Sequence, residues 1–231
     1  MALQAPTFTP SNRTPQTALE PGTYPARVVR VIDEGLQPQT DFTTKEPKKP
    51  AQIIRVTYEL VDAFMLDDDG NELEDKPRWL SENFPLHAIT SDLAKSTKRI
   101  NAIDPKGTLK GDWSQVIGMP CSVVVGNYTS KEVLRDKVLN VTAIRARDAA
   151  TLPELKNEGK FFDLSNPDLE FFTSLPKWQQ DIIKGNLEFA GSPLDRALGG
   201  KPSPTKKEQE QKVEEATEAE ASAEDGEDIP W

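Results

Sequence analysis

The sequence predicts a mainly β protein in which five strands form a barrel, with one helix inserted after the third strand. Three observations predict it. Runs that are rich in β-branched residues, or that alternate between apolar and polar residues, occur at five places between residues 21 and 147. Turn-forming residues separate several of these runs. One stretch with residues at helical spacing lies between the third run and the fourth.

The first three strands are expected at residues 23–32, 52–61 and 78–84. The first is β-branched and follows the turn signal Pro21-Gly22. A long polar connection, residues 33–50, leads to the second. The second strand alternates, so one face should be buried and the other polar. Its expected core face consists of Ile54, Val56, Tyr58 and Leu60.

A helix should follow the third strand. Thr90 or Ser91 can cap it, Asp92 favours its first turn, and Asp104-Pro105 ends it. A second short helical piece is expected at residues 113–117. Two long strand-like runs follow at residues 119–129 and 132–145, joined closely enough for a hairpin.

This order of strands and helix is that of an OB-fold, a five-stranded, partly open barrel whose face and loops bind oligonucleotides. An immunoglobulin-like sandwich fits less well, because it needs about seven strands and has no central helix. We therefore expect a flexible N-terminal arm at residues 1–20 and an OB-fold-like domain at residues 21–147. A helical extension should occupy residues 148–198, and a disordered linker with an acidic tail residues 199–231.

The extension at residues 148–198 is rich in aromatic residues and interrupted by prolines. Helices are expected at residues 178–189 and 193–198. A segment of this size rarely holds a core of its own, so it should pack on the barrel or across a second subunit. Its surplus of apolar surface favours a homodimer. The expected apolar anchors are Phe161, Phe162, Phe171, Phe172 and Trp178.

Charge is distributed unevenly along the chain. Residues 208–231 hold ten acidic side chains and one lysine, so they account for nearly all of the net charge of −10. The preceding residues are close to neutral, and nucleic acid therefore stays a candidate partner. The single cysteine, Cys121, favours a reducing compartment. The sequence shows neither a secretory signal nor an apolar run near 20 residues, so we expect a soluble, cytoplasmic protein.

Catalysis is poorly supported by the sequence. His87 is the only histidine, so histidine-based metal clusters and relays are not expected, and His87 should be an ordinary loop residue. The acidic run at residues 67–72 does not match a calcium loop and should be a solvated turn. We therefore expect no enzyme activity, no metal and no cofactor. A nuclease that uses Asp67 to Asp69 and Glu72 with a metal ranks a distant third among the functions considered.

The last seven residues combine acidic side chains with an apolar tip, a pattern typical of a short docking motif. This Asp-Ile-Pro-Trp ending resembles the C-terminus of bacterial single-stranded DNA-binding proteins, which end in Asp-Ile-Pro-Phe. Residues 162–169, Phe-Asp-Leu-Ser-Asn-Pro-Asp-Leu, and residues 175–178, Leu-Pro-Lys-Trp, resemble the segment after the barrel in phage-encoded proteins of that kind. Together the two resemblances cover about a third of the chain.

The resemblance implies a protein that coats exposed single strands in DNA replication, recombination and repair, in the cytoplasm of a bacterial host. It also implies that the acidic tip recruits replication or recombination proteins. The implied partner-binding residues are Asp225, Glu227, Asp228, Ile229, Pro230 and Trp231. The alternative function that we considered is a virion assembly or scaffold protein whose acidic tail acts as a chaperone.

Single-strand binding needs aromatic faces for stacking and cations for phosphates. Tyr58 shares the apolar face of its strand and should be core, and Phe42 and Phe84 are further aromatic candidates. Trp79 and Tyr128 are the best stacking candidates, and Arg55 lies on the polar face where an OB-fold commonly meets its ligand. The candidate nucleic-acid-binding residues are Tyr24, Arg27, Lys45, Lys48, Lys49, Arg55, Arg78, Trp79, Tyr128, Lys131, Arg135 and Lys137.

Overall fold

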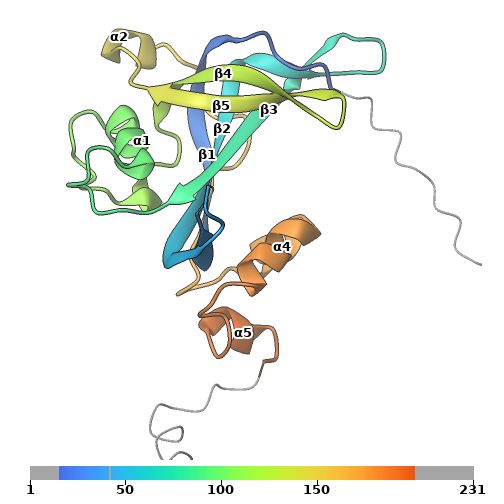
Figure 1. Cartoon of the computed structure of the whole chain (residues 1–231). Helices are drawn as coiled ribbons and strands as arrows, with labels where there is room; N and C mark the ends of the chain where they lie inside the picture. The colour runs from blue at the N-terminus through green and yellow to red at the C-terminus, as the bar shows by residue number, and fades with distance from the viewer. Residues whose placement is uncertain (1–15, 42, 201–231) are drawn as a thin grey trace, which may run out of the picture. The chain divides into compact units, whose positions relative to one another are not determined.

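A computed structural model describes residues 16–41 and 43–200 of the chain, which form two compact units that divide between Asp163 and Leu164 (Figure 1). The first unit is the predicted mainly β fold, a nearly closed antiparallel barrel. Its strands lie in the order β3-β2-β1-β4-β5. The helix α1 (Lys95–Ile103) and the short helix η1 (Trp113–Gln115) come between β3 and β4. The five strands are β1 (Gly22–Thr40), β2 (Pro47–Leu66), β3 (Glu72–Pro85), β4 (Pro120–Ser130) and β5 (Val133–Thr142).

The barrel core follows the alternation predicted for the second strand. Ile54, Val56, Tyr58 and Leu60 of β2 are all buried, as expected. They pack with apolar residues of β1, β3, β4 and β5 in one cluster. Phe84 of β3 and Trp113 belong to the same cluster, with ring centroids 5.6 Å apart. The sulfur of Cys121 is also inside, and burial raises the pKa of its thiol to about 12.

The connection between β1 and β2 differs from the expected polar loop. Both strands run on as a paired ribbon, β1 to Thr40 and β2 from Pro47, so the described part of the connection is only residues 41 and 43–46. The Asp41 carboxylate accepts hydrogen bonds from the backbone N–H groups of Thr43 and Thr44, which fixes this turn. Register shifts along β1, one of them at Gly35 with φ of 81°, absorb the irregular polar sequence. Bulges of this kind hide a strand from a simple alternation pattern.

The helix α1 begins later than predicted. The turns at Ser91 and Ala94 precede it, and its N-cap, Ala94, makes no side-chain cap. The Ser96 hydroxyl instead accepts a hydrogen bond from the backbone N–H of His87. This contact connects the helix to the loop after β3.

Charged side chains close the seam between β3 and β5, which stand at the two ends of the strand order. At one end, Arg78 of β3 pairs with Asp136 of β5 at 2.6 Å. At the other, Arg99 of α1 pairs with Glu82 of β3 at 2.7 Å and also donates to the Leu139 carbonyl of β5. One ion pair therefore bridges β3 and β5 directly, and Arg99 of α1 bridges them at the other end through Glu82 and the Leu139 carbonyl.

Residues 16–20, here called the N-terminal strap, are hydrogen-bonded to four strands. Gln16 exchanges two bonds with the backbone of Leu66, and Arg78 donates to the Thr17 carbonyl. The N–H of Leu19 donates to Asp136 at 2.7 Å, and the side chain of Asn127 donates to the Leu19 carbonyl. The expected flexible arm therefore does not extend to residues 16–20, because side chains distant in sequence hold them. Residues 1–15 lie outside the described part of the chain.

Residues 152–162 cover the outer face of β1 and β2. Arg27 donates to the carbonyls of Leu152 and Pro153, and the Glu59 carboxylate accepts from the backbone N–H of Lys156. The strand β6 (Lys160–Phe162) then pairs parallel to β1. The sequence placed these residues in the extension, whereas the structure includes them in the first unit, together with the short helix α2 (Ala146–Ala149).

The second unit contains three short helices, α3 (Leu169–Ser174), α4 (Lys177–Lys184) and α5 (Pro193–Ala197). Asp168 and Ser192 cap α3 and α5 with their side-chain oxygens. The helix α4 ends at Lys184, with Gly185 as its C-cap, five residues before its predicted end. Among the expected anchors, Phe162, Phe171 and Phe172 are buried, whereas Phe161 and Trp178 are exposed. No helix in the described residues is long and apolar enough to cross a membrane.

Candidate nucleic-acid interface

The β4–β5 hairpin gathers four of the predicted site residues on one open surface near its turn, the end of the hairpin that points away from α1 (Figure 1). Tyr128 lies directly across from Arg135, and Gly126 across from Lys137. Residues that face each other in an antiparallel pair project from the same side of the sheet. Lys131 and Glu132 form the turn, both with positive φ, which places Lys131 at the end of this surface.

Two aliphatic side chains that were not predicted as site residues complete this surface. Val133 and Leu139 are 50% and 55% exposed, beside Tyr128 at 46%. Leu139 lies over Gly126, because a Cβ on that glycine would be 2.5 Å from the Leu139 Cδ1 atom. We call Tyr128, Val133, Arg135, Lys137 and Leu139 the hairpin face. In the sequence, the spacing of two between Val133, Arg135, Lys137 and Leu139 is the signal that could have identified it.

A cleft of about 460 Å³ lies at the hairpin, next to the N-terminal strap. It offers an aromatic ring, a guanidinium and aliphatic side chains within one space. The only acid in its lining, Asp136, is already paired with Arg78 and bonded to the N–H of Leu19. The cleft is lined by Gln16, Ala18, Tyr128, Val133, Leu134, Arg135 and Asp136.

A second cationic group lies on the β1–β2 turn. Lys45, Lys48 and Lys49 are all exposed there. Lys48 pairs with Asp41 at 2.5 Å, and this pair together with the turn hydrogen bonds holds the pKa of the Asp41 carboxyl well below its usual range. Because the pair is solvent-exposed, it adds little to stability, and the Lys48 ammonium stays accessible to an anion.

The other five predicted residues are used inside the fold. Tyr24 donates its hydroxyl to the Glu20 carbonyl, and burial raises the pKa of its phenol. Arg27, Arg55 and Arg78 are largely buried, and their guanidinium groups bind backbone carbonyls or the carboxylates of Glu34 and Asp136.

Trp79 is the remaining member of that group. It donates its indole N–H to Glu59 at 3.0 Å, and the guanidinium of Arg30 lies 5.0 Å from its ring centroid. Since residues 152–162 cover the adjoining outer face, we do not place these five side chains at the interface. The OB-fold face at which Arg55 was expected to meet a ligand is therefore used for intramolecular packing.

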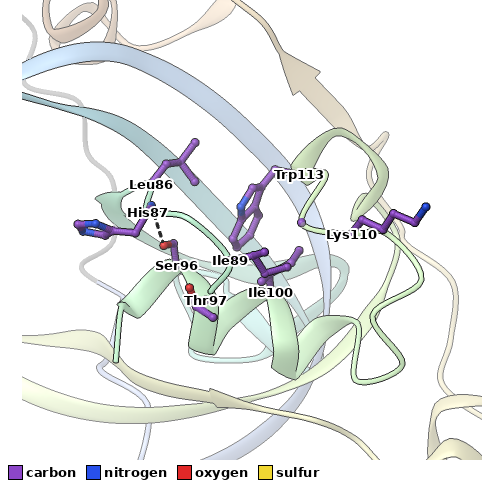
Figure 2. Close-up of a pocket in the computed structure, with 9 residues that line it drawn as sticks. Leu86, His87, Ile89, Ser96, Thr97, Ile100, Lys110 and Trp113 are labelled. Atoms are coloured by element: carbon purple, nitrogen blue, oxygen red, sulfur yellow. Dashed lines mark hydrogen bonds between the residues drawn. The ribbon is translucent and has the colours of Figure 1, made fainter. Parts of the chain in front are cut away.

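A separate pocket of about 220 Å³ lies between α1, the loop after β3 and Trp113. Figure 2 shows Ile89 and Ile100 beneath the indole ring and the imidazole of His87 directed away from it. The lining is mostly apolar and includes none of the predicted site residues. His87 is an exposed loop residue, and the described residues contain no cluster of metal-binding side chains.

Phe42 and the predicted partner-binding residues Asp225, Glu227, Asp228, Ile229, Pro230 and Trp231 lie outside the described residues. Comparisons of the chain with protein-family models and with curated proteins find no match.

Proposed function

We propose that this protein binds single-stranded DNA through the hairpin face and the lysines of the β1–β2 turn. The observation that carries the proposal is the Tyr128–Arg135 cross-strand pair, which lines a cleft and has Lys131 and Lys137 beside it. A ring can stack on a base while neighbouring cations contact the flanking phosphates. Stacking tolerates every base, so we expect binding with little sequence preference.

The same proposal gives the acidic residues 208–231 two roles. They compete with DNA for the cationic surfaces of the barrel, and the residues 225–231 recruit replication or recombination proteins once DNA has displaced them. The charge of this segment supports the first role, because ten carboxylates and one lysine form a strongly anionic stretch. Its apolar Ile-Pro-Trp ending supports the second, because Trp is favoured as an anchor in protein interfaces.

Titration of the full-length protein with labelled oligo-dT tests the proposal. We expect binding at low salt, weaker binding to duplex of equal length, and a steep loss of affinity as salt rises. Each phosphate contact to a single strand contributes about 0.7 to the slope of log K against log salt. A protein that ignores oligo-dT in dilute buffer, with and without residues 208–231, does not have this function. A scaffold protein would give that result.

Neutralising the hairpin cations should flatten the salt dependence. In the triple variant Lys131→Gln, Arg135→Gln and Lys137→Gln, we expect the slope to fall by about 2, since roughly 0.7 is lost per contact. The matched control is Lys98→Gln, Lys106→Gln and Lys110→Gln, which removes the same charge from α1 and the loop after it. An equal loss of slope in both variants would mean that net charge, and not the hairpin, determines affinity.

Deleting residues 208–231 should tighten binding to oligo-dT and abolish capture of partner proteins. The tightening is expected because an intramolecular anion competes with DNA at high effective concentration. The substitution Trp231→Ala is the control, since it keeps the acidic charge and should leave DNA affinity almost unchanged. Fluorescence anisotropy at one low salt concentration measures the DNA affinity of the deletion variant and of Trp231→Ala. Unchanged affinity after the deletion would contradict the competition between tail and DNA.

A further inference from the structure

The cleft at the hairpin contains a negative charge at a place where the proposed ligand is also negative. Among the described residues that line the cleft, Asp136 is the only acid. It lies between the exposed Arg135 and Lys137 in β5. A carboxylate repels a nearby phosphate, and the repulsion is stronger beside protein than in bulk water because the local dielectric constant is lower. DNA binding at this cleft therefore requires that the charge of Asp136 be offset.

The guanidinium of Arg78 provides that offset. Its Nη2 atom lies 2.6 Å from Oδ2 of Asp136, and the two side chains are only 11% and 9% exposed. The other carboxylate oxygen, Oδ1, accepts a hydrogen bond from the backbone N–H of Leu19 at 2.7 Å. Arg78 also donates from Nη1 to the Thr17 carbonyl at 2.6 Å. The ion pair and the N-terminal strap are therefore held together by one set of contacts.

The strap explains why an acid occurs in this cleft. Asp136 binds the strap at Leu19, and the strap contributes Gln16 and Ala18 to the cleft lining. Without its cation, the same carboxylate would place an unpaired negative charge beside the ligand. Arg78 does not line the cleft, so it influences the ligand through Asp136 and not by direct contact.

We propose that Arg78 is a positioning residue for DNA at the hairpin face: it masks the charge of Asp136, so that this acid can hold the strap without repelling phosphates. This inference rests on the proposed function. Its distinguishing consequence is the direction of two effects. Loss of the Arg78 charge should weaken DNA binding and loss of the Asp136 charge should strengthen it, although both changes break the same ion pair and both should lower the unfolding temperature.

Oligo-dT titration of the full-length protein at several salt concentrations tests the inference. Arg78→Gln should lower the affinity at low salt on the order of tenfold, because Asp136 then carries an unpaired charge. Asp136→Asn keeps an oxygen for the Leu19 N–H and should raise the affinity on the order of threefold, because the Arg78 charge is then unopposed. Both differences from wild type should shrink as salt rises, since ions screen charges over about 10 Å at 0.1 M and about 3 Å at 1 M.

Three further variants serve as controls. Arg78→Lys keeps the positive charge and should bind nearly as well as wild type. The double variant Arg78→Gln and Asp136→Asn has the net charge of the wild type and should also restore its affinity, which is the non-additivity expected of an interacting pair. Arg145→Gln removes the cation of the exposed Arg145–Asp148 pair, which does not line the cleft, and should leave the affinity nearly unchanged. Thermal unfolding checks that each variant is folded.

The outcomes separate this inference from the proposed function. If the wild-type protein does not bind oligo-dT, both are overturned. If it binds, and the hairpin variants weaken binding while Arg78→Gln binds as wild type, only the role of Arg78 is overturned. Equal weakening in Arg78→Gln and Asp136→Asn, by the same factor at every salt concentration, would mean that the pair only holds the fold. If Arg78→Gln does not fold, Asp136→Asn decides, because tighter binding supports the masking of its charge and weaker binding overturns it.

Discussion

Replacing Tyr128 with alanine should reduce the affinity for oligo-dT by about five- to 150-fold at low salt. Stacking of a base on an aromatic ring contributes roughly 1–3 kcal/mol by alanine substitution, and each 1.4 kcal/mol corresponds to a factor of ten. Tyr128 is 46% exposed, so the free energy of unfolding should change little. Because the change removes no charge, the slope of affinity against salt should stay at its wild-type value. Fluorescence anisotropy across a salt series measures both quantities.

Three control variants test whether this result depends on the Tyr128 ring. Tyr128→Phe keeps the aromatic face and should bind nearly as well as wild type, whereas Tyr128→Leu keeps the apolar volume but should lose most of the stacking. Trp178→Ala removes another exposed aromatic, from the second unit, and should leave the affinity unchanged. Wild-type affinity in Tyr128→Ala would show that bases do not stack on the hairpin face.

The predictable part of this fold is the part in which sequence periodicity and burial coincide. Ile54, Val56, Tyr58 and Leu60 alternate in the sequence, and the barrel buries all of them. The two runs around residues 119–145 predicted a hairpin, and the turn at Lys131 and Glu132 sets the register that pairs Tyr128 with Arg135. Local turn geometry is sufficient to fix such a pairing.

The parts that could not be predicted depend on contacts between residues far apart in the chain. Arg55 was correctly assigned to the polar side of β2, yet it pairs there with Glu34, a buried carboxylate at the register shift between Asp33 and Gly35 in β1. The strap bonds join residues 50 to 117 positions apart. A periodic sequence pattern carries no information on such pairings, so the sequence did not predict the intramolecular contacts that five of the candidate site residues make. Val133 and Leu139 were missed for the opposite reason, because exposed β-branched and aliphatic residues in a strand resemble core.

Removing the Glu82 carboxylate should destabilise the barrel more than any other single change that we consider. Glu82 is 7% exposed, and Arg99 is 3% exposed. Its carboxylate accepts hydrogen bonds from Arg99 and from the Tyr58 hydroxyl and pairs with Lys95 at 2.7 Å. Glu82→Ala would leave the Arg99 guanidinium buried without its counter-ion. Loss of one partner of a buried pair costs about 3–5 kcal/mol, so we expect the free energy of unfolding to fall by that amount.

Urea denaturation measures this loss of stability. Two further variants serve as comparisons, one for an exposed ion pair and one in which both charges of the buried pair are removed. Arg145→Ala removes a member of the exposed Arg145–Asp148 pair and should cost at most about 1 kcal/mol. The double variant Glu82→Leu and Arg99→Met removes both charges and fills the space with apolar atoms, so it should recover more than half of the lost stability. If Glu82→Ala alone does not fold, the stability of the double variant still tests whether the loss comes from the unpaired Arg99 guanidinium. A loss of less than about 1 kcal/mol in Glu82→Ala would mean that the seam between β3 and β5 is held by packing, and that its ion pairs contribute no more than those on the surface.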